Sequence, residues 1–300
     1  MMSPQRPFII AGIPAYDEET NIGKVVVNAQ KLVDKVIVCD DGSGDMTAEI
    51  AGRLGADVVR HEKNGGYGSA IRSLFLRARE MGADILVTLD ADGQHNPEDI
   101  KAVIAPIMAE SADMSIGMRD LGAKGGIPGY RRRGISFISS LTRTASGTTV
   151  MDSQSGFRAY SRKALSMVGP SEQGMGVSTE ILIKAADKGL RITEVPIKVR
   201  YNLKTSTSTH TPMYQALDVI GSTIKHVSIR HPLVFFGLPG LIFSAIGLLF
   251  GFWALSIYES QRQVLISVTL IAAGSLILGA ILATTAVILY TIISVVRDRA

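Results

Sequence analysis

The sequence predicts an α/β domain with a mostly parallel sheet, followed by a hairpin of two membrane-spanning helices. Short apolar runs alternate with segments of helical periodicity over the first part of the chain, which is typical of parallel sheets covered by helices. Polar or acidic loops follow these runs, and the C-terminal part is nearly free of charged residues. The 300 residues leave room for one domain of ordinary size and an appendage, and the positive mean hydropathy indicates that the appendage is apolar.

The expected strands and helices follow one another in pairs. Each strand is a short apolar run, and each helix repeats its apolar residues at helical spacing. The four pairs are 8–13 with 22–32, 36–39 with 46–54, 57–59 with 69–81, and 85–89 with 97–108. A further strand is expected at 114–116, after which the regular alternation ends.

Residues 119–156 are rich in Gly, Ser, Thr and Arg, and we expect loops there around one helix, 131–144. That helix carries apolar residues among basic ones, so two positions fit it equally: the membrane surface, or the sheet, as an ordinary amphipathic helix. A second amphipathic segment, 213–230, is the better interfacial candidate because it continues into an apolar span. The expected organisation is a soluble domain over 1–211, an interfacial helix over 212–231 and a membrane hairpin over 232–300.

Two long apolar segments, 232–258 and 264–296, make up the C-terminal part. Each exceeds the ~20 residues that cross a bilayer as a helix. The connector between them is short, so both outer ends of the hairpin are expected on one side of the membrane. Basic residues at the outer ends outnumber the single Arg262 of the connector, which predicts that the soluble domain is cytoplasmic. The outer basic residues are Lys225, Arg230, Arg297 and Arg299.

Charge and cysteine content narrow the class of function. The formal net charge is +4, and basic residues gather around 131–133 and beside the spans, which favours anionic lipid or phosphate as a partner. No nucleic-acid-binding module is recognisable. The single Cys39 excludes an intramolecular disulfide and is expected as a packing residue. Three small residues of the second span permit copies of the chain to associate: Gly274, Gly279 and Ala280.

The most informative segment is Leu89-Asp90-Ala91-Asp92-Gly93-Gln94-His95, where two carboxylates follow an apolar run. Asn96 and Pro97 then begin the next helix, so the pair lies at the carboxyl end of a strand. Open α/β sheets bind ligands at that end, and carboxylate oxygens suit Mg²⁺ or Mn²⁺ holding a substrate diphosphate. The alternative is a polar turn with Asp caps. A hard cation does not need His95, which we leave out of the metal site.

The other strand ends are also polar. They carry Ile13-Pro14-Ala15-Tyr16-Asp17-Glu18, Asp40-Asp41-Gly42-Ser43-Gly44-Asp45 and Asn64-Gly65-Gly66-Tyr67-Gly68-Ser69-Ala70. Because parallel strands end along one edge, these residues should converge on a nucleotide. Asp40 or Asp41 would accept from base or ribose hydroxyls, and Gly65, Gly66 and Gly68 would allow close backbone approach. The dinucleotide fingerprint is absent, since Pro14, Tyr16 and Glu18 occupy its place.

Together with Ser155-Gly156-Phe157-Arg158, these motifs resemble glycosyltransferase family 2, and within it the polyprenyl-phosphate sugar synthases of the dolichyl-phosphate mannose or glucose synthase type. The resemblance runs from about Phe8 to Tyr201. It implies a GT-A fold, a nucleotide-diphosphate-sugar donor, a divalent metal and inversion at the anomeric carbon. It also implies that Asp90, Asp92 and Gln94 surround the metal, and that a nucleotide pocket is lined by Pro14, Tyr16, Glu18 and Asp40 or Asp41.

The acceptor side can be argued from charge. A polyprenyl monophosphate has a second pKa near ~6, so its attacking oxygen is largely ionised at neutral pH and needs no strong general base. Two phosphate-bearing substrates repel each other, which calls for Arg or Lys near the acceptor. The candidates are Arg119, Arg131, Arg132, Arg133 and Arg200. The resemblance favours Arg119 together with one of the later arginines, while 131–133 would serve equally as lipid-headgroup contacts.

Asp152 is expected either to orient the acceptor or one of these arginines, or to be a turn residue. The candidate catalytic residues are therefore Asp90, Asp92, Arg119 and Asp152. The predicted function is transfer of one sugar from a nucleotide-sugar to a lipid-linked phosphate at the cytoplasmic membrane face. Two alternatives are a processive polysaccharide synthase, which should carry a Gln-x-x-Arg-Trp segment whereas the only Trp253 lies in a span, and a catalytically silent membrane-anchored binding protein.

Overall fold

The structure is a computed structural model that describes residues 6–119, 150–198, 221, 224, 228 and 232–298. Two compact units, Met1–Thr223 and Ile224–Ala300, make up the chain. The predicted helix 131–144, Arg131, Arg132, Arg133 and Arg200 lie outside the described residues, as does most of the segment 213–230.

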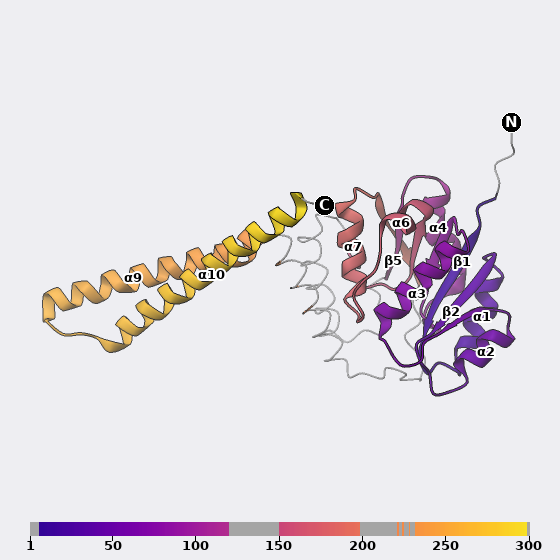
Figure 1. Ribbon diagram of the computed structural model, residues 1–300, viewed down its shortest axis with the longest axis horizontal. Coiled ribbons are helices and arrows are strands. Elements are labelled where there is room, and N and C mark those ends of the chain that lie inside the picture. Colours follow the sequence, from indigo (N-terminus) through magenta and orange to yellow (C-terminus); the bar gives the residue numbers. More distant parts are fainter. Residues whose placement is uncertain are drawn as a thin grey trace. The chain divides into compact units, whose positions relative to one another are not determined.

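The first unit is built on a seven-stranded sheet with the order β3-β2-β1-β4-β6-β5-β7, flanked by helices on both faces (Figure 1). β6 pairs antiparallel with both neighbours, and all other neighbours pair in parallel, which confirms the mostly parallel sheet. The strands are β1 (Ile9–Ala15), β2 (Lys35–Asp40), β3 (Asp57–Arg60), β4 (Ile85–Thr88), β5 (Met114–Arg119), β6 (Arg158–Ser161) and β7 (Ile192–Ile197). The helices are α1 (Ile22–Gln30), α2 (Thr47–Arg53), α3 (Tyr67–Glu80), the 3-10 turn η1 (Pro97–Asp99), α4 (Ile100–Met108), α6 (Arg162–Met167) and α7 (Val177–Asp187).

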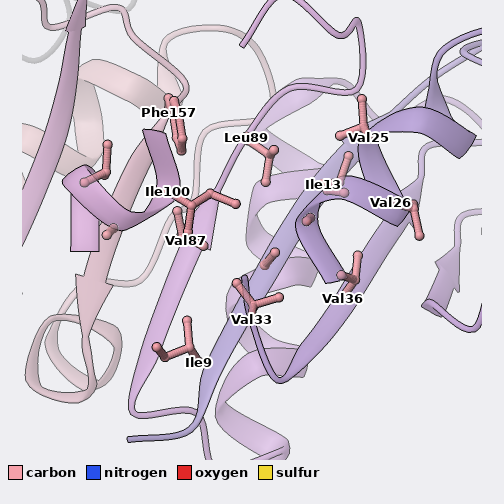
Figure 2. Close-up of a cluster of buried hydrophobic side chains, with 14 of the residues drawn as sticks. Ile9, Ile13, Val25, Val26, Val33, Val36, Val87, Leu89, Ile100 and Phe157 are labelled. Atoms are coloured by element: carbon pink, nitrogen blue, oxygen red, sulfur yellow. The ribbon is translucent and has the colours of Figure 1, made fainter. Parts of the chain in front are cut away.

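The alternation of side chains along β1 divides the core into two layers. Ile9, Ala11 and Ile13 face a cluster formed with α1, α2 and α4, part of which Figure 2 shows. Ile10 points to the other face, where a second cluster is formed with α3, α6 and α7. All seven β1 residues are buried, because a parallel strand at the centre of a sheet is covered on both faces.

Four elements after residue 157 do not follow from the sequence periodicity. β6 and α6 are short, and β6 begins with an arginine that the fold buries completely. α7 is buried around most of its circumference and so lacks a clear polar face. β7 contains Glu194 and Pro196, which a strand tolerates at the edge of a sheet, where β7 lies.

The strand order places a topological switch point between β1 and β4. The chain proceeds from β1 to β2 and β3 on one side, and β4 then pairs with the other side of β1. The connections that leave β1 and β4 therefore run in opposite directions along the sheet, and open α/β sheets bind ligands where the strand order reverses in this way. The β1 loop carries Tyr16 and Glu18, and the β4 loop carries Asp90 and Asp92.

The second unit is a helical hairpin. A π-helical turn, η2 (Leu233–Gly237), leads into α9 (Leu238–Gln261), and α10 (Ile266–Asp298) returns alongside it. The segments Leu233–Gln261 and Ile266–Val295, with mean hydropathy values of 2.3 and 2.4, are long and apolar enough to cross a membrane. Large apolar side chains on both helices face outward, which indicates a membrane anchor.

Small residues allow α9 and α10 to approach closely. A Cβ on Gly240 would lie 2.9 Å from the backbone nitrogen of Ala283, and one on Gly247 would lie 2.7 Å from Cγ of Leu276. Gly279 lies against Ser244 in this same contact. Gly279 therefore serves packing within the hairpin.

Candidate active site

Hydrogen bonds join the loops that follow β1 and β2. The backbone nitrogen of Asp17 donates to Oγ of Ser43 at 2.9 Å, and the nitrogen of Gly44 donates to Oδ1 of Asp17 at 2.9 Å. The nitrogen of Glu18 donates to Oγ1 of Thr47 at 2.8 Å, and the Glu18 side chain is mostly buried. These contacts hold the β1 loop, with Tyr16 and Glu18, in one conformation against the β2 loop.

Asp40 and Asp41 are both buried and both engaged within the chain. Asp40 pairs with Arg60 (Oδ2 to Nε, 3.1 Å) and accepts from the backbone and hydroxyl of Ser43. Asp41 accepts from the backbone nitrogens of Gly65 (3.0 Å) and Gly66 (2.8 Å). The carboxylates predicted to meet a nucleotide directly therefore hold the loops that follow β2 and β3.

The glycine-rich segment makes a close approach, and the contact is with another part of this chain. Gly66 has φ +90°, and a Cβ there would lie 2.6 Å from the carbonyl oxygen of Gln173. The nitrogen of Gly68 donates to that oxygen at 2.7 Å, and a Cβ on Gly68 would overlap the carbonyl of Glu172. Glycine is required at both positions to pack residues 172–173 against the start of α3.

Asp90 and Asp92 lie at the end of β4, where the sequence places them. The hydroxyl of Tyr67 donates to Oδ1 of Asp90 at 3.3 Å, and a Cβ on Gly156 would lie 2.7 Å from the same oxygen. The backbone nitrogen of Gln94 donates to Oδ1 of Asp92 at 2.9 Å. Burial raises the pKa of Asp92 to about 7, and the negative charges of Asp90 and Glu18 add to this rise. Carboxylates from both sides of the switch point thus create a negative potential that favours a cation.

His95 is buried beside this pair. Its Nδ1 lies 3.8 Å from Oδ2 of Asp90 and has no hydrogen-bond partner among the residues that the structure describes. Its ring packs on Phe157 with 5.1 Å between centroids. Burial lowers the pKa of His95 and so favours the neutral ring.

Arg119 and Asp152 form a two-point ion pair. Nε of Arg119 lies 2.7 Å from Oδ2, and Nη2 lies 2.8 Å from Oδ1. Asp152 is buried, and its backbone nitrogen donates to Oε1 of Glu194 at 2.8 Å. Of the five arginines expected to meet an acceptor, Arg119 is the one among the described residues, and the structure brings it together with Asp152.

Two side chains that the sequence analysis left without a role shape this site. Arg158 is fully buried and donates to the carbonyl oxygens of Ser155 (2.7 Å), Ser153 (2.6 Å) and Ser178 (2.9 Å). It thereby fixes the segment that carries Asp152 and Gly156. Tyr67 contacts Asp90 as described above. Both belong to quoted motifs, but the partners of each come from distant parts of the chain.

The side-chain oxygens near Asp90 fit a divalent cation whose remaining ligands come from a substrate. Within the described ranges, no group of three or more His, Cys, Asp or Glu side chains is arranged to hold a metal. Two carboxylates and the Gln94 amide would leave several coordination positions open. Mg²⁺ is commonly bound in this way, through one or two carboxylates plus substrate phosphates.

An acidic pair at the switch point of a mostly parallel sheet fits an enzyme that binds its substrate with a divalent cation, and comparison with known proteins shows the family. Residues 11–169 match the model of glycosyl transferase family 2, and the chain belongs to this family. This confirms the predicted resemblance.

Curated relatives are also similar. A UDP-N-acetylglucosamine–dolichyl-phosphate N-acetylglucosaminyltransferase of Methanococcus voltae is 38% identical over 211 residues, which cover 63% of this chain and 84% of the relative. A dolichyl-phosphate hexose transferase of Haloferax volcanii is 33% identical over 187 residues, 62% of this chain and 79% of the relative.

The fold resembles that of a solved enzyme structure. Glucosyl-3-phosphoglycerate synthase of Mycobacterium tuberculosis, in complex with Mn²⁺, UDP and phosphoglyceric acid, matches with a TM-score of 0.59 and 22% identity. The match covers 74% of this chain and 78% of that protein. It confirms the predicted GT-A-like fold.

Proposed function

We propose that this protein is a polyprenyl-phosphate hexosyltransferase. It transfers one sugar, with inversion, from a nucleotide-diphosphate-sugar to a dolichyl-type phosphate at the cytoplasmic face of the membrane. The observation that carries the proposal is the Asp90–Asp92 pair beside a switch point, in a family 2 chain that ends in an apolar hairpin. The names of the two dolichyl-phosphate transferases above support the acceptor class.

The donor pocket is formed along the edge where β1, β2 and β3 end. Pro14, near the end of β1, and Tyr16 and Glu18, in the loop that follows, line it directly. Asp40 and Asp41 contribute by holding their loops, since their carboxylates are engaged with Arg60, Ser43 and glycine amides. Gly65 and Gly66, just before α3, and Gly68, in its first turn, form one wall of the pocket.

Asp90, Asp92 and Gln94 hold Mg²⁺ or Mn²⁺. When bound there, such a cation would supply positive charge that offsets the charge of the departing nucleoside diphosphate. Without a cation, burial of Asp92 disfavours its ionised form, and repulsion from Asp90 adds to the rise in its pKa. A bound cation and the ionised form of Asp92 therefore stabilise each other.

The acceptor phosphate needs no strong base, because its oxygen is already ionised at neutral pH. That oxygen forms a bond to the anomeric carbon while the bond from this carbon to the donor diphosphate breaks. The electron pair leaves with the diphosphate, and attack from the opposite face inverts the configuration. Arg119, oriented by Asp152, binds the acceptor phosphate together with one of the candidates Arg131, Arg132, Arg133 and Arg200.

The hairpin explains how a lipid acceptor and a soluble donor meet. The acceptor chain stays in the bilayer, and α9 and α10 keep the first unit at the surface where the phosphate emerges. Positive residues beside the spans favour the cytoplasmic side.

The test is a screen of radiolabelled nucleotide-sugars with polyprenyl phosphate and full-length protein in detergent, with and without Mn²⁺, reading lipid-extractable product. We expect product with one donor class, dependence on the cation, and loss of product in Asp92→Ala. Asp187→Ala, at the exposed end of α7, is the matched control and should retain activity. Full turnover by Asp92→Ala, or no product with any donor, would overturn the proposal.

A further inference from the structure

Behind the glycine-rich segment, a hydrogen-bonded chain runs through three side chains from separate elements. Oδ1 of Asp41, just after β2, lies 2.6 Å from Nδ1 of His61, just after β3. Nε2 of His61 lies 2.8 Å from Oγ of Ser73 in α3. The His61 side chain is 21% exposed and the Asp41 side chain 5%, so the chain is largely shielded from solvent.

The hydrogen-bond partners of His61 indicate which ring nitrogen carries a proton. An ionised carboxylate can only accept, so His61 carries a proton on Nδ1 and donates it to Asp41. In the neutral ring Nε2 then accepts the hydroxyl proton of Ser73. The backbone nitrogen of His61 also donates to the carbonyl of Asp40 at 2.9 Å, and this contact fixes the backbone position from which the His61 side chain extends.

The Asp41 carboxylate, held by His61, in turn holds the backbone of the glycine segment. Oδ1 accepts from His61 and from the nitrogen of Gly65, while Oδ2 accepts from the nitrogen of Gly66. Rotating the carboxylate would break both glycine contacts together. The hydroxyl of Ser69 donates to the carbonyl of Gly65 at 2.7 Å, so the turn is held from both sides.

The order Asp, His, Ser resembles a hydrolytic triad, but the surroundings do not support one. Ser73 lies inside α3, where backbone amides are used in helical hydrogen bonds and cannot form an oxyanion hole. Cys39, whose Sγ lies 3.6 Å from Nε2 of His61, is buried, and burial raises its pKa to about 12. Neither group is an available nucleophile, and the arrangement is suited to holding Asp41 in place.

We propose that His61 is a positioning residue of the donor pocket, which fixes Asp41 and through it the Gly65–Gly66 turn. The inference rests on the proposed function in one respect: the turn must form a wall of the nucleotide-sugar pocket. His61 itself does not touch the donor. Its loss should therefore weaken donor binding and leave the chemical step largely unchanged.

Two substitutions separate the contacts of the ring. In His61→Asn the amide nitrogen reaches the position of Nδ1, so it keeps the Asp41 contact and loses Ser73. In His61→Gln the amide nitrogen reaches the position of Nε2, so it keeps Ser73 and loses Asp41. Ser73→Ala removes the distal contact of the ring, together with the contact between Ser73 and Cys39, leaves the contact with Asp41 in place and is the matched control.

The readouts are KM and kcat for the donor identified by the screen, the Kd for UDP and for GDP, and hydrogen exchange of residues 62–69 in full-length protein without substrates. For His61→Gln we expect donor KM or nucleotide Kd to rise about tenfold, kcat to stay within about threefold, and exchange to accelerate. His61→Asn and Ser73→Ala should stay within about twofold of wild type on every measure.

Equal impairment of His61→Asn and His61→Gln, or wild-type behaviour of His61→Gln, would overturn the inference. If His61→Gln does not fold, the result for His61→Asn decides. Wild-type hydrogen exchange and wild-type donor KM in His61→Asn support the role, and a rise in donor KM of about tenfold refutes it. Exchange requires neither donor nor acceptor. An absence of transfer in wild type would therefore count against the proposed function alone, while exchange would still show whether His61 holds the turn.

Discussion

Arg119 and Asp152 meet in a side-on ion pair, with Nε 2.7 Å from Oδ2 and Nη2 2.8 Å from Oδ1. The backbone nitrogen of Arg119 donates to the same carboxylate at 3.2 Å. The two residues are 33 positions apart and join the end of β5 to the segment that leads into β6. Because Asp152 is buried and the Arg119 side chain is 17% exposed, the guanidinium has a defined direction.

This geometry predicts that lysine cannot replace Arg119. An ammonium group keeps the charge but cannot make the two parallel contacts with Asp152. We expect Arg119→Lys to raise the KM for polyprenyl phosphate by about tenfold, with donor KM within about twofold. Steady-state kinetics with each substrate varied in turn would measure this. A change confined to the donor KM would contradict the acceptor role of Arg119.

The raised pKa of Asp92 predicts a pH-dependent stability. The folded-state value of about 7 lies above the usual 3.8, so folding disfavours the ionised form, and this residue's contribution to stability falls as pH rises from about 4 to about 7. In EDTA at pH 8, Asp92→Asn should unfold at a higher temperature than wild type, by roughly 2 °C or more. Below pH 4 the two should coincide.

Thermal unfolding across this pH range checks the prediction, with Asp187→Asn as the control for loss of one exposed carboxylate. Adding Mn²⁺ at pH 8 should stabilise wild type more than Asp92→Asn, because only wild type retains both carboxylates. Parallel stability curves for the two proteins would mean that Asp92 ionises freely in the fold.

Gly156 is predicted to be essential for the geometry of Asp90. A methyl group there would lie 2.7 Å from both Oδ1 of Asp90 and Oη of Tyr67, so one of these groups must move. We expect Gly156→Ala to lower metal-dependent transfer by about tenfold or more while the protein stays folded. Gly169→Ala is the matched control, because a Cβ there meets no described atom within 4 Å. Equal activities of the two variants would refute the prediction.

The hairpin offers a similar comparison between one closely packed glycine, Gly247, and one with open space beside it, Gly251. A side chain on Gly247 would collide with Leu276, whose Cγ and backbone nitrogen lie 2.7 and 2.8 Å from the added Cβ. At Gly251 a Cβ meets no described atom within 4 Å. Gly247→Ile should lower the unfolding temperature in detergent by several degrees, on the order of ~1–3 kcal/mol, whereas Gly251→Ile should have little effect. Equal destabilisation would mean that the helices pack through other faces.

The hydrophobic periodicity was sufficient to predict the strands and helices in the first half of the first unit. The runs around Ile10, Val38 and Leu86 are strongly apolar, and the helices between them have one buried face, so local pattern and tertiary structure agree. The pattern fails from β6 onward, because Arg158 is buried by partners that come from other segments and β7 lies at an edge. Burial of an arginine depends on its distant acceptors, which local sequence does not contain.

The candidate site likewise has features that the sequence predicts and features that only the tertiary structure shows. The chain's order of residues by itself determined that Asp90 and Asp92 follow a buried strand, that the strand ends are polar, and that the C-terminal part is apolar enough to cross a membrane. Only the tertiary structure decided that Asp41 holds the glycine turn, that His61 holds Asp41, and that Asp152 holds Arg119. The physical reason is that periodicity and strand ends are properties of neighbouring residues. A hydrogen bond between side chains 20 or 33 positions apart exists only when the sheet has brought its strands into register.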